Sequence, residues 1–342
     1  MNSQITTYHL QRENNPRRQT ALSFPFLGQL GLTSEPDLLA CRKHLQELLR
    51  SSACQKPISG EPLIIGLAES GIIPSGLMHQ VVREQQISAG WICSTRRRAS
   101  GIRFMESHSH SPHHILPLPQ FQPSQLWFVE DEITTGRTIL NLALHLCSLL
   151  QVRQMRFFTI ADSRSPAQIA QFESILADRD IQFSTHTLIP LPPDRQDIAQ
   201  NLQHQDIIIS EDMIVTEPDE IQSQWQLPEQ RAALQTQWHI VPDLANNLQG
   251  SLLAIGEAID LALRMVRGNP QLSFQQITLN PWRVDGINIQ HRLDICDKYY
   301  LYNYKHLKSP IYLLYDPHDR AIASAAKKQL SQAGFTVNDI IF

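Results

Sequence analysis

The sequence predicts an α/β protein in which helices flank a parallel sheet, followed by a second, smaller α/β domain. Short apolar runs alternate with segments of helical apolar spacing, which is typical of parallel strands joined by crossover helices. This alternation occurs in two series, separated by a stretch rich in proline, glutamine and acidic residues. The length of 342 residues, 42% of them hydrophobic and 18% charged, is sufficient for two domains.

The first series predicts the main sheet. Residues 62–68, "PLIIGLA", form a compact strand candidate, and residues 72–86 have helical apolar spacing. Further strands are predicted at 90–96, 113–119, 125–131 and 155–162, with an apolar helix at 137–151. We therefore expect residues 1–190 to form the first domain.

The second series follows a linker predicted at 191–235, in which a strand at "DIIIS" is an alternative. In residues 236–342, strands are expected at 250–256, 274–280, 309–316 and 335–342, and helices at 257–268 and 320–334. Gly268 and Gly334 are typical helix stops.

Composition narrows the function class. The formal net charge of -4 provides no general basic field, so nucleic acid is not an expected partner. The five cysteines are scattered without a CxxC pair, which indicates reduced thiols rather than disulfides or a zinc finger. The polar N-terminus and the absence of a long apolar run predict a cytoplasmic protein without a membrane span.

The segment "LWFVEDEITTGRTILNL", residues 126–142, combines acids with an anion-binding loop. A strand predicted to end at Asp131 would place the following turn where ligands bind in α/β sheets. Gly136 allows close backbone approach, and the helix N-terminus favours a phosphate. Glu130 and Asp131 suit hydroxyl groups or a magnesium ion, so together the segment describes a ribose 5-phosphate site. The alternative is an ordinary strand before a threonine-capped helix, and the pattern leaves Glu132 facing solvent or acting as a base.

This pattern resembles the 5-phosphoribosyl-1-pyrophosphate (PRPP) motif of type I phosphoribosyltransferases. "NNPRR" (14–18), "PLIIGLAES" (62–70), "STRRR" (94–98) and "FMESHSHSPHH" (104–114) extend the similarity over about residues 10–190. In this order they resemble the family associated with tellurite-resistance and stress-response gene clusters. "AIGEAIDLALRM" and "YYLYNYKH" resemble its C-terminal TRSP domain, although "TLNP" (278–281) stands where that domain has T-R-S-P.

The resemblance implies a type I phosphoribosyltransferase-like fold and a transferase that uses PRPP and Mg²⁺. It would join ribose 5-phosphate to an unidentified nitrogenous acceptor base with release of pyrophosphate, in the biosynthesis of a nucleoside-like metabolite. Glu130 and Asp131 would hold the ribose hydroxyls, with Asp131 on Mg²⁺ directly or indirectly. The 5-phosphate would be bound by Thr134, Thr135, Gly136, Arg137 and Thr138. A regulatory protein that binds PRPP without turnover is the alternative, and a homodimer is left open.

The pyrophosphate site is expected in "GLAESG", which follows the first strand. The predicted residues are Ala68, Glu69, Ser70 and Gly71, together with Arg96, because arginine pairs well with diphosphate oxygens. Glu69 departs from the basic or neutral loops of the superfamily and would reach the diphosphate only through magnesium. The alternative is a plain strand-to-helix turn with Glu69 near the helix start.

The histidine-rich segment "ESHSHSPHH" has two functional interpretations. On an extended chain Glu106, His108 and His110 project to one side, a spacing suited to a transition metal. By resemblance, the segment is the mobile loop that closes over the substrate, where these residues would transfer protons. A surface histidine cluster is the third possibility.

Three further features have both functional and structural interpretations. Asp162, Ser163 and Arg164 either contact the acceptor base or belong to the cap of a helix that starts at Pro166, and capping is preferred. The tyrosines of "YYLYNYKH" form either a stacking surface or a half-buried strand, and the strand is preferred. Glu257, beside Gly256 at a strand–helix junction, is a weaker site candidate.

Overall fold

The computed structural model describes residues 5–13, 20–55, 58, 60–97, 99–105, 113–119, 121–190, 214–216, 245–267 and 269–341. The chain divides into two compact units, one formed by residues 42–236 and the other by residues 1–41 together with 237–342. The sequence placed residues 1–41 in the first domain, and the structure differs because β3 (Thr33–Ser34) pairs antiparallel with β13 (Leu272–Ile277). A two-residue strand carries no periodicity that predicts its partner.

The unit of residues 42–236 contains the predicted parallel sheet, with strand order β10-β9-β8-β4-β5. Its strands are β4 (Pro62–Gly66), β5 (Gly90–Cys93), β8 (Gln125–Ile133), β9 (Gln154–Asp162) and β10 (Gln182–Pro190), and all four pairings are parallel. The edge strand β10 was not predicted. Its residues are mostly polar and half-buried, so it lacks the apolar run that identifies the four others.

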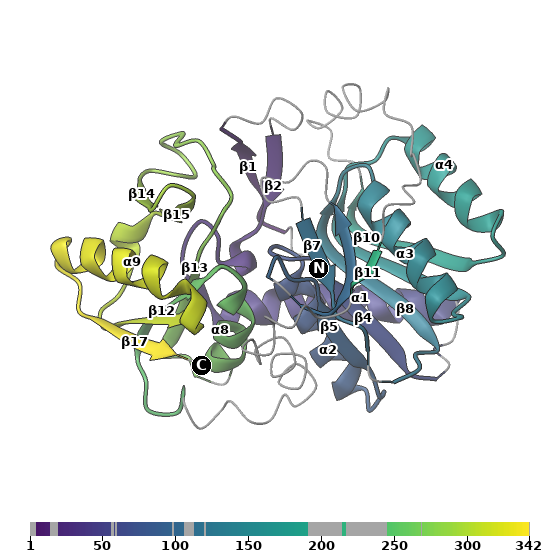
Figure 1. The fold of residues 1–342 in the computed structure, drawn as a ribbon, viewed down its shortest axis with the longest axis horizontal. Coiled ribbons are helices and arrows are strands. Elements are labelled where there is room, and N and C mark those ends of the chain that lie inside the picture. Colours follow the sequence, from purple (N-terminus) through teal and green to yellow (C-terminus); the bar gives the residue numbers. More distant parts are fainter. Residues whose placement is uncertain are drawn as a thin grey trace. The chain divides into compact units, whose positions relative to one another are not determined.

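Helices cover both faces of this sheet (Figure 1). They are α2 (Ile72–Glu84), α3 (Arg137–Leu149) and α4 (Pro166–Ala177). The connection from β4 to β5 runs in one direction along the sheet, and those from β8 to β9 and β10 run in the other. Right-handed crossovers therefore place α2 on one face and α3 and α4 on the opposite face.

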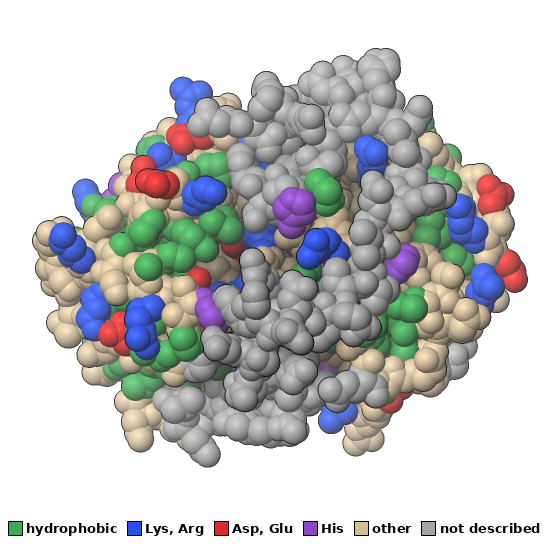
Figure 2. Space-filling model, in the orientation of Figure 1, with side chains coloured by type: hydrophobic (Ala, Val, Ile, Leu, Met, Phe, Trp, Pro, Cys, Tyr) green, Lys and Arg blue, Asp and Glu red, His purple; other side chains and the backbone are tan. Residues whose placement is uncertain are grey.

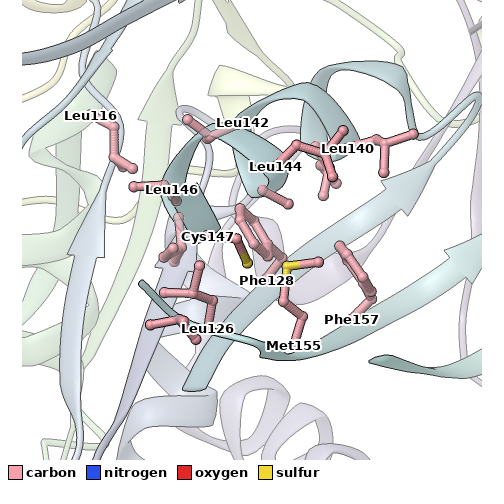
Figure 3. Packing of buried hydrophobic residues seen from close by; sticks show 14 of the residues in the cluster. Leu116, Leu126, Phe128, Leu140, Leu142, Leu144, Leu146, Cys147, Met155 and Phe157 are labelled. Atoms are coloured by element: carbon pink, nitrogen blue, oxygen red, sulfur yellow. The ribbon is translucent and has the colours of Figure 1, made fainter. Parts of the chain in front are cut away.

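The main core lies between the sheet and α3. Leu140 and Leu146 of α3 pack with Leu126 and Phe128 of β8 and with Phe157 of β9, as Figure 3 shows. Phe172 of α4 meets Phe157 edge-on, with ring centroids 5.1 Å apart. This core holds the carboxyl ends of β8 and β9 and the start of α3 in place.

The other face of the sheet buries polar side chains among aromatic rings. The Arg156 guanidinium lies over the Trp127 ring at 5.4 Å and donates to the hydroxyl of Ser52 in α1 (Glu35–Gln55). His186 is 6% exposed and stacks on Phe158, and its Nε2 is 2.9 Å from Ser184 Oγ. Burial, together with the positive charge of Arg156, lowers the pKa of His186 to about 4 from 6.5.

This pKa predicts acid sensitivity of folding. The His186 imidazole stays neutral in the folded chain but protonates below about pH 6.5 when the chain is unfolded. Protonation therefore stabilises the unfolded state, so the stability that His186 contributes is present above pH 6.5 and is lost as pH falls toward 4. We expect the free energy of unfolding, measured by urea titration, to fall by about 2 kcal/mol between pH 7 and pH 5 through His186 alone. His186→Phe keeps a ring on Phe158 and should lose that part of the pH dependence. An equal pH dependence in both proteins would contradict the assignment.

A small antiparallel sheet accompanies the main one, with order β11-β6-β7. The strands β6 (Gly101–Met105) and β7 (His113–Leu116) pair as a hairpin on either side of residues 106–112. Strand β11 (Ile214–Thr216) pairs with β6. The segment predicted as a linker at 191–235 thus contains a strand, while "DIIIS" lies outside the described residues.

The second unit contains a five-stranded sheet of order β17-β16-β12-β13-β3. Strands β12 (Gly250–Ile255), β13, β16 (Ile311–Tyr315) and β17 (Val337–Ile341) are parallel, and α8 (Ile259–Val266) and α9 (Arg320–Gln332) connect them. The predicted second α/β series is confirmed. Two hairpins, β1 (Tyr8–Gln11) with β2 (Thr20–Ser23) and β14 (Arg292–Ile295) with β15 (Tyr299–Tyr302), complete this unit.

The tyrosine-rich segment belongs largely to the core of this unit. Tyr302 is fully buried, and its hydroxyl donates to the Asn280 carbonyl at 2.6 Å. Asn303 is also buried and donates to the carbonyls of Leu30 and Asn288. The structure therefore favours the strand interpretation over a ligand-stacking surface.

The described surface carries charges of both signs, and the described helices are those of a chain without a long apolar run. Lysine, arginine and acidic side chains are interspersed over the described part of the face in Figure 2, in keeping with the net charge of -4. Among the described residues, no helix has the length and apolar character that a membrane crossing requires.

Candidate functional site

Two of the predicted loops meet at the carboxyl edge of the parallel sheet. β4 and β8 are neighbours in the sheet, and residues 67–71 follow β4 while residues 134–136 follow β8. After β4 the next strand lies toward one edge of the sheet, and after β8 the next strands lie toward the other edge, so a topological switch point lies between these two parallel neighbours. Ligands of α/β proteins bind at such switch points. A hydrogen bond of 2.8 Å from Leu67 N to Glu130 Oε1 joins the two strand ends. The strand order thus brings together loops that are more than 60 residues apart.

The loop before α3 has the geometry of an anion site. Gly136 is the N-cap residue with φ 74°, a left-handed conformation that favours glycine. Arg137 N donates to Thr135 Oγ1 at 3.3 Å, and the bond from Leu140 N to Gly136 O closes the first helical turn. The N–H groups of Thr138 and Ile139 precede that bond and have no acceptor within the helix. They and the helix dipole favour an anion beside Thr134–Thr138.

The structure gives the two neighbouring acids different surroundings. Glu130 and Asp131 are 7% and 8% exposed, and as consecutive strand residues they point to opposite faces. The Glu130 carboxylate lies against the 67–71 loop, where a Cβ on Gly71 would come within 2.7 Å of both its oxygens. Glycine at position 71 therefore leaves the room that Glu130 needs to reach Leu67 N.

The third acid has a defined partner. Glu132 Oε1 accepts a hydrogen bond of 2.7 Å from Ser163 Oγ, and Ser163 N donates to the Ile133 carbonyl at 2.8 Å. These bonds tie the end of β9 to the end of β8. The sequence left Glu132 undecided because its partner, Ser163, directly follows a different strand, β9.

The loop after β4 is held by side chains from other elements. Ala68 N donates to Ser94 Oγ at 2.9 Å, and Arg96 Nη2 donates to the Ala68 carbonyl at 3.2 Å. Arg96 Nη1 also lies 3.0 Å from Glu69 Oε1, and the Glu69 side chain is buried. The Ala68–Glu69 peptide bond is cis. Arg96 thus lies at the loop where the sequence expected it, with Glu69 as its partner.

The rest of this loop forms the turn into α2. Gly71 N donates to the Leu67 carbonyl at 2.8 Å and Ile72 N to the Glu69 carbonyl at 3.2 Å. Ser70 is half-buried. The strand-to-helix turn and the contact with Arg96 are both present, so a plain turn and a diphosphate loop are compatible interpretations of "GLAESG".

A contact near this loop joins Ser94, which the sequence did not single out, to His114, which the sequence placed only within the histidine-rich segment. Ser94 Oγ lies 3.0 Å from Nδ1 of His114, and both residues are buried. Ser94 directly follows β5, at the same sheet edge as the two loops. The strand predicted at 90–96 placed Ser94 inside the strand, whereas β5 ends at Cys93.

A buried ion pair lies beside the phosphate-type loop. Arg164 donates from Nε to Asp162 Oδ1 at 2.9 Å and from Nη2 to Asp162 Oδ2 at 2.7 Å, and it is 1% exposed. Its Cζ lies over the Phe172 ring at 4.7 Å. Helix α4 is capped by Ser165, whose hydroxyl accepts from Gln168 N at 3.2 Å, with Pro166 in the first turn. Capping was predicted correctly, but the capping residue is neither Asp162 nor Ser163.

The predicted loop residues Glu106, His108 and His110 lie outside the described residues, as do Arg98 and residues 14–18. Within the described ranges, no group of three or more histidine, cysteine, aspartate or glutamate side chains is arranged to hold a metal ion. Glu257 is buried in the middle of η4 (Gly256–Ala258), the short turn that precedes α8.

Comparisons with known proteins connect these loops to a family. The model of a family described as phosphoribosyl transferase matches residues 9–190, more than half of the chain and the part that contains both loops. No curated protein matches the sequence.

Solved structures with a similar arrangement include three adenine phosphoribosyltransferases. That of Trypanosoma brucei is 12% identical, with a TM-score of 0.37 over 55% of this chain and 79% of its own. That of Giardia lamblia is 14% identical, with a TM-score of 0.35 over 53% and 93%. That of Leishmania tarentolae is 16% identical, with a TM-score of 0.36 over 52% and 79%. At these scores the alignments are distant, and the family match carries the relationship.

Proposed function

Because this chain belongs to the phosphoribosyl transferase family, we propose that it transfers ribose 5-phosphate from PRPP to a nitrogenous acceptor base and releases pyrophosphate. The supporting observation is the meeting of the 67–71 and 134–138 loops at the switch point of the sheet, joined through Glu130 and Leu67. The 134–138 loop suits the 5-phosphate of PRPP, and the 67–71 loop suits the diphosphate of the same molecule. The product would enter the biosynthesis of a nucleoside-like metabolite.

The 5-phosphate is assigned to Thr134–Thr138. The N–H groups of the first turn of α3 and the threonine hydroxyls supply donors, while Gly136 leaves its backbone accessible. Arg137, half-buried at the first helical position, adds positive charge. These donors match the acceptor oxygens of a dianionic phosphate group, whereas a neutral ligand would leave most of them unmatched.

The ribose hydroxyls are assigned to Glu130 and Asp131. Both carboxylates lie at the carboxyl end of β8, directly before the phosphate loop, and carboxylates accept hydrogen bonds from hydroxyl groups. Glu130 would combine this contact with its bond to Leu67 N. Asp131 would face the ligand from the other side of the strand.

Magnesium fits this set of donors. Mg²⁺ is usually bound by one or two carboxylates together with substrate phosphates, so a cage made only of protein ligands is not required. Asp131 would hold the ion directly or through water. When bound, the ion would neutralise charge on the departing diphosphate.

The diphosphate is assigned to the backbone of the 68–71 loop, to the Ser70 hydroxyl and to Arg96. Arg96 is already fixed at this loop by the Ala68 carbonyl and by Glu69. Its guanidinium presents several N–H donors, so it can bind a diphosphate oxygen while it keeps one of these contacts. Glu69 would thus orient Arg96 rather than bind the diphosphate itself.

The reaction follows from this placement. The bond between ribose C1 and the diphosphate oxygen breaks, the electron pair leaves with the diphosphate, and the acceptor nitrogen bonds to C1. Catalysis would come from positioning and from positive charge at the leaving group. Glu106, His108 and His110 are assigned to proton transfer at the acceptor or the leaving group. Pyrophosphate release from PRPP with a panel of nitrogenous bases tests the activity, and no release with any base would contradict it.

Asp131→Asn tests the assignment of the carboxylate. We expect PRPP, titrated calorimetrically in the presence of Mg²⁺, to bind about tenfold more weakly, because an amide replaces a charged acceptor. Asp178→Asn, at an exposed position after α4, is the matched control and should leave the affinity unchanged. Unchanged affinity in Asp131→Asn would remove this residue from the site.

A further inference from the structure

The contact between Ser94 and His114 links the β6–β7 hairpin to the loop assigned to diphosphate. We propose that His114 is a positioning residue for that loop. His114 acts through Ser94 on the backbone of Ala68. The inference rests on the proposed function of the 67–71 loop. It adds a coupling between the loop and the two strands that flank residues 106–112.

The hydrogen bonds form a continuous chain. Ala68 N–H donates to Ser94 Oγ at 2.9 Å, which leaves the hydroxyl proton and a second lone pair of that oxygen for His114 Nδ1, 3.0 Å away. Either tautomer of His114 completes the chain, because Nδ1 can accept the hydroxyl proton or an Nδ1–H can donate to Oγ. Successive hydrogen bonds in a buried chain strengthen one another.

His114 is held rigidly at its end of the chain. It is 1% exposed, lies opposite Phe104 in the hairpin, and stacks on the Phe104 ring with centroids 5.2 Å apart. The next residue, Ile115, exchanges backbone hydrogen bonds of 2.8 and 2.7 Å with Thr95. A displacement of β7 would therefore move both His114 and the segment that carries Ser94.

The other end of the chain determines the orientation of the loop backbone. The N–H of Ala68 is held by Ser94 and its carbonyl by Arg96, which also pairs with Glu69. Loss of the serine acceptor leaves the Ala68 N–H buried without this bond and releases one of these restraints. The phosphate-type loop is supported separately, by Thr135 and by the packing of Gly136 near Phe172.

Three variants test the coupling. His114→Phe retains a ring on Phe104 but removes the hydrogen-bonding group, whereas His114→Asn retains an amide that can accept or donate near the position of Nδ1 and loses the ring. Ser94→Ala removes the middle of the chain with a small change in volume. Inorganic pyrophosphate and ribose 5-phosphate are titrated separately by calorimetry in Mg²⁺, and thermal unfolding confirms that each variant is folded.

We expect Ser94→Ala and His114→Phe to bind pyrophosphate about tenfold more weakly and ribose 5-phosphate with unchanged affinity. His114→Asn should stay within about threefold of the wild type for pyrophosphate. Equal losses for both ligands, or unchanged pyrophosphate affinity in Ser94→Ala, would overturn the inference. If His114→Phe does not fold, Ser94→Ala makes the same comparison. A wild-type protein that binds neither ligand would instead contradict the proposed function.

Discussion

Replacement of Arg164 by methionine should lower the free energy of unfolding by about 3–5 kcal/mol, measured by urea titration. Arg164 and Asp162 are 1% and 5% exposed, and two hydrogen bonds of 2.9 and 2.7 Å join their side chains. Methionine would preserve much of the packing on Phe172 but would leave the Asp162 carboxylate buried without its cation. Loss of one partner of a buried pair costs more than the pair itself contributes.

The double variant Asp162→Asn/Arg164→Met is the control for this prediction. It removes both charges, and the asparagine can still accept from the backbone N–H of residue 164, which donates to Asp162 Oδ1 at 3.1 Å. We expect it to recover most of the stability lost in Arg164→Met. A loss below about 1 kcal/mol in the single variant would show that water or another group compensates for the buried carboxylate.

Gly136→Val should reduce the affinity for ribose 5-phosphate at least about a hundredfold. The backbone at Gly136 has φ 74°, which a β-branched residue adopts only with strain, and a Cβ there would lie 3.0 Å from the Phe172 ring. Relief of both requires the loop to move, and its N–H groups would then no longer converge on the phosphate. Calorimetric titration with ribose 5-phosphate measures the effect.

Gly286→Val provides a control with the same backbone strain. Gly286 has φ 75°, is exposed, and apart from Gly286 and its two chain neighbours no atom of the described residues lies within 4 Å of a Cβ built there. The control should lose stability through backbone strain and still bind ribose 5-phosphate as the wild type does. Comparable losses of affinity in both variants would mean that strain in general, rather than the geometry of the phosphate loop, governs binding.

Local patterns predicted β4, β5, β8 and β9 of the main sheet because the residues of these strands are almost all buried. The apolar runs at β4, β8 and β9 and the helical spacing of α2 and α3 are visible without tertiary information. β10 was missed because an edge strand of half-buried polar residues has no such run. The pairing of β3 with β13, which assigns residues 1–41 to the second unit, joins two segments more than 200 residues apart.

The sequence by itself determined the α/β class, the turn at Thr134–Thr138 before a helix and the place of the acids before that turn, because these depend on residue type and short spacing. Only the tertiary structure decided the partners of the polar groups. Glu130 reaches Leu67, Glu132 reaches Ser163, and Ala68 connects through Ser94 to His114. These contacts span 20 to 63 residues and depend on strand order, which local periodicity does not encode.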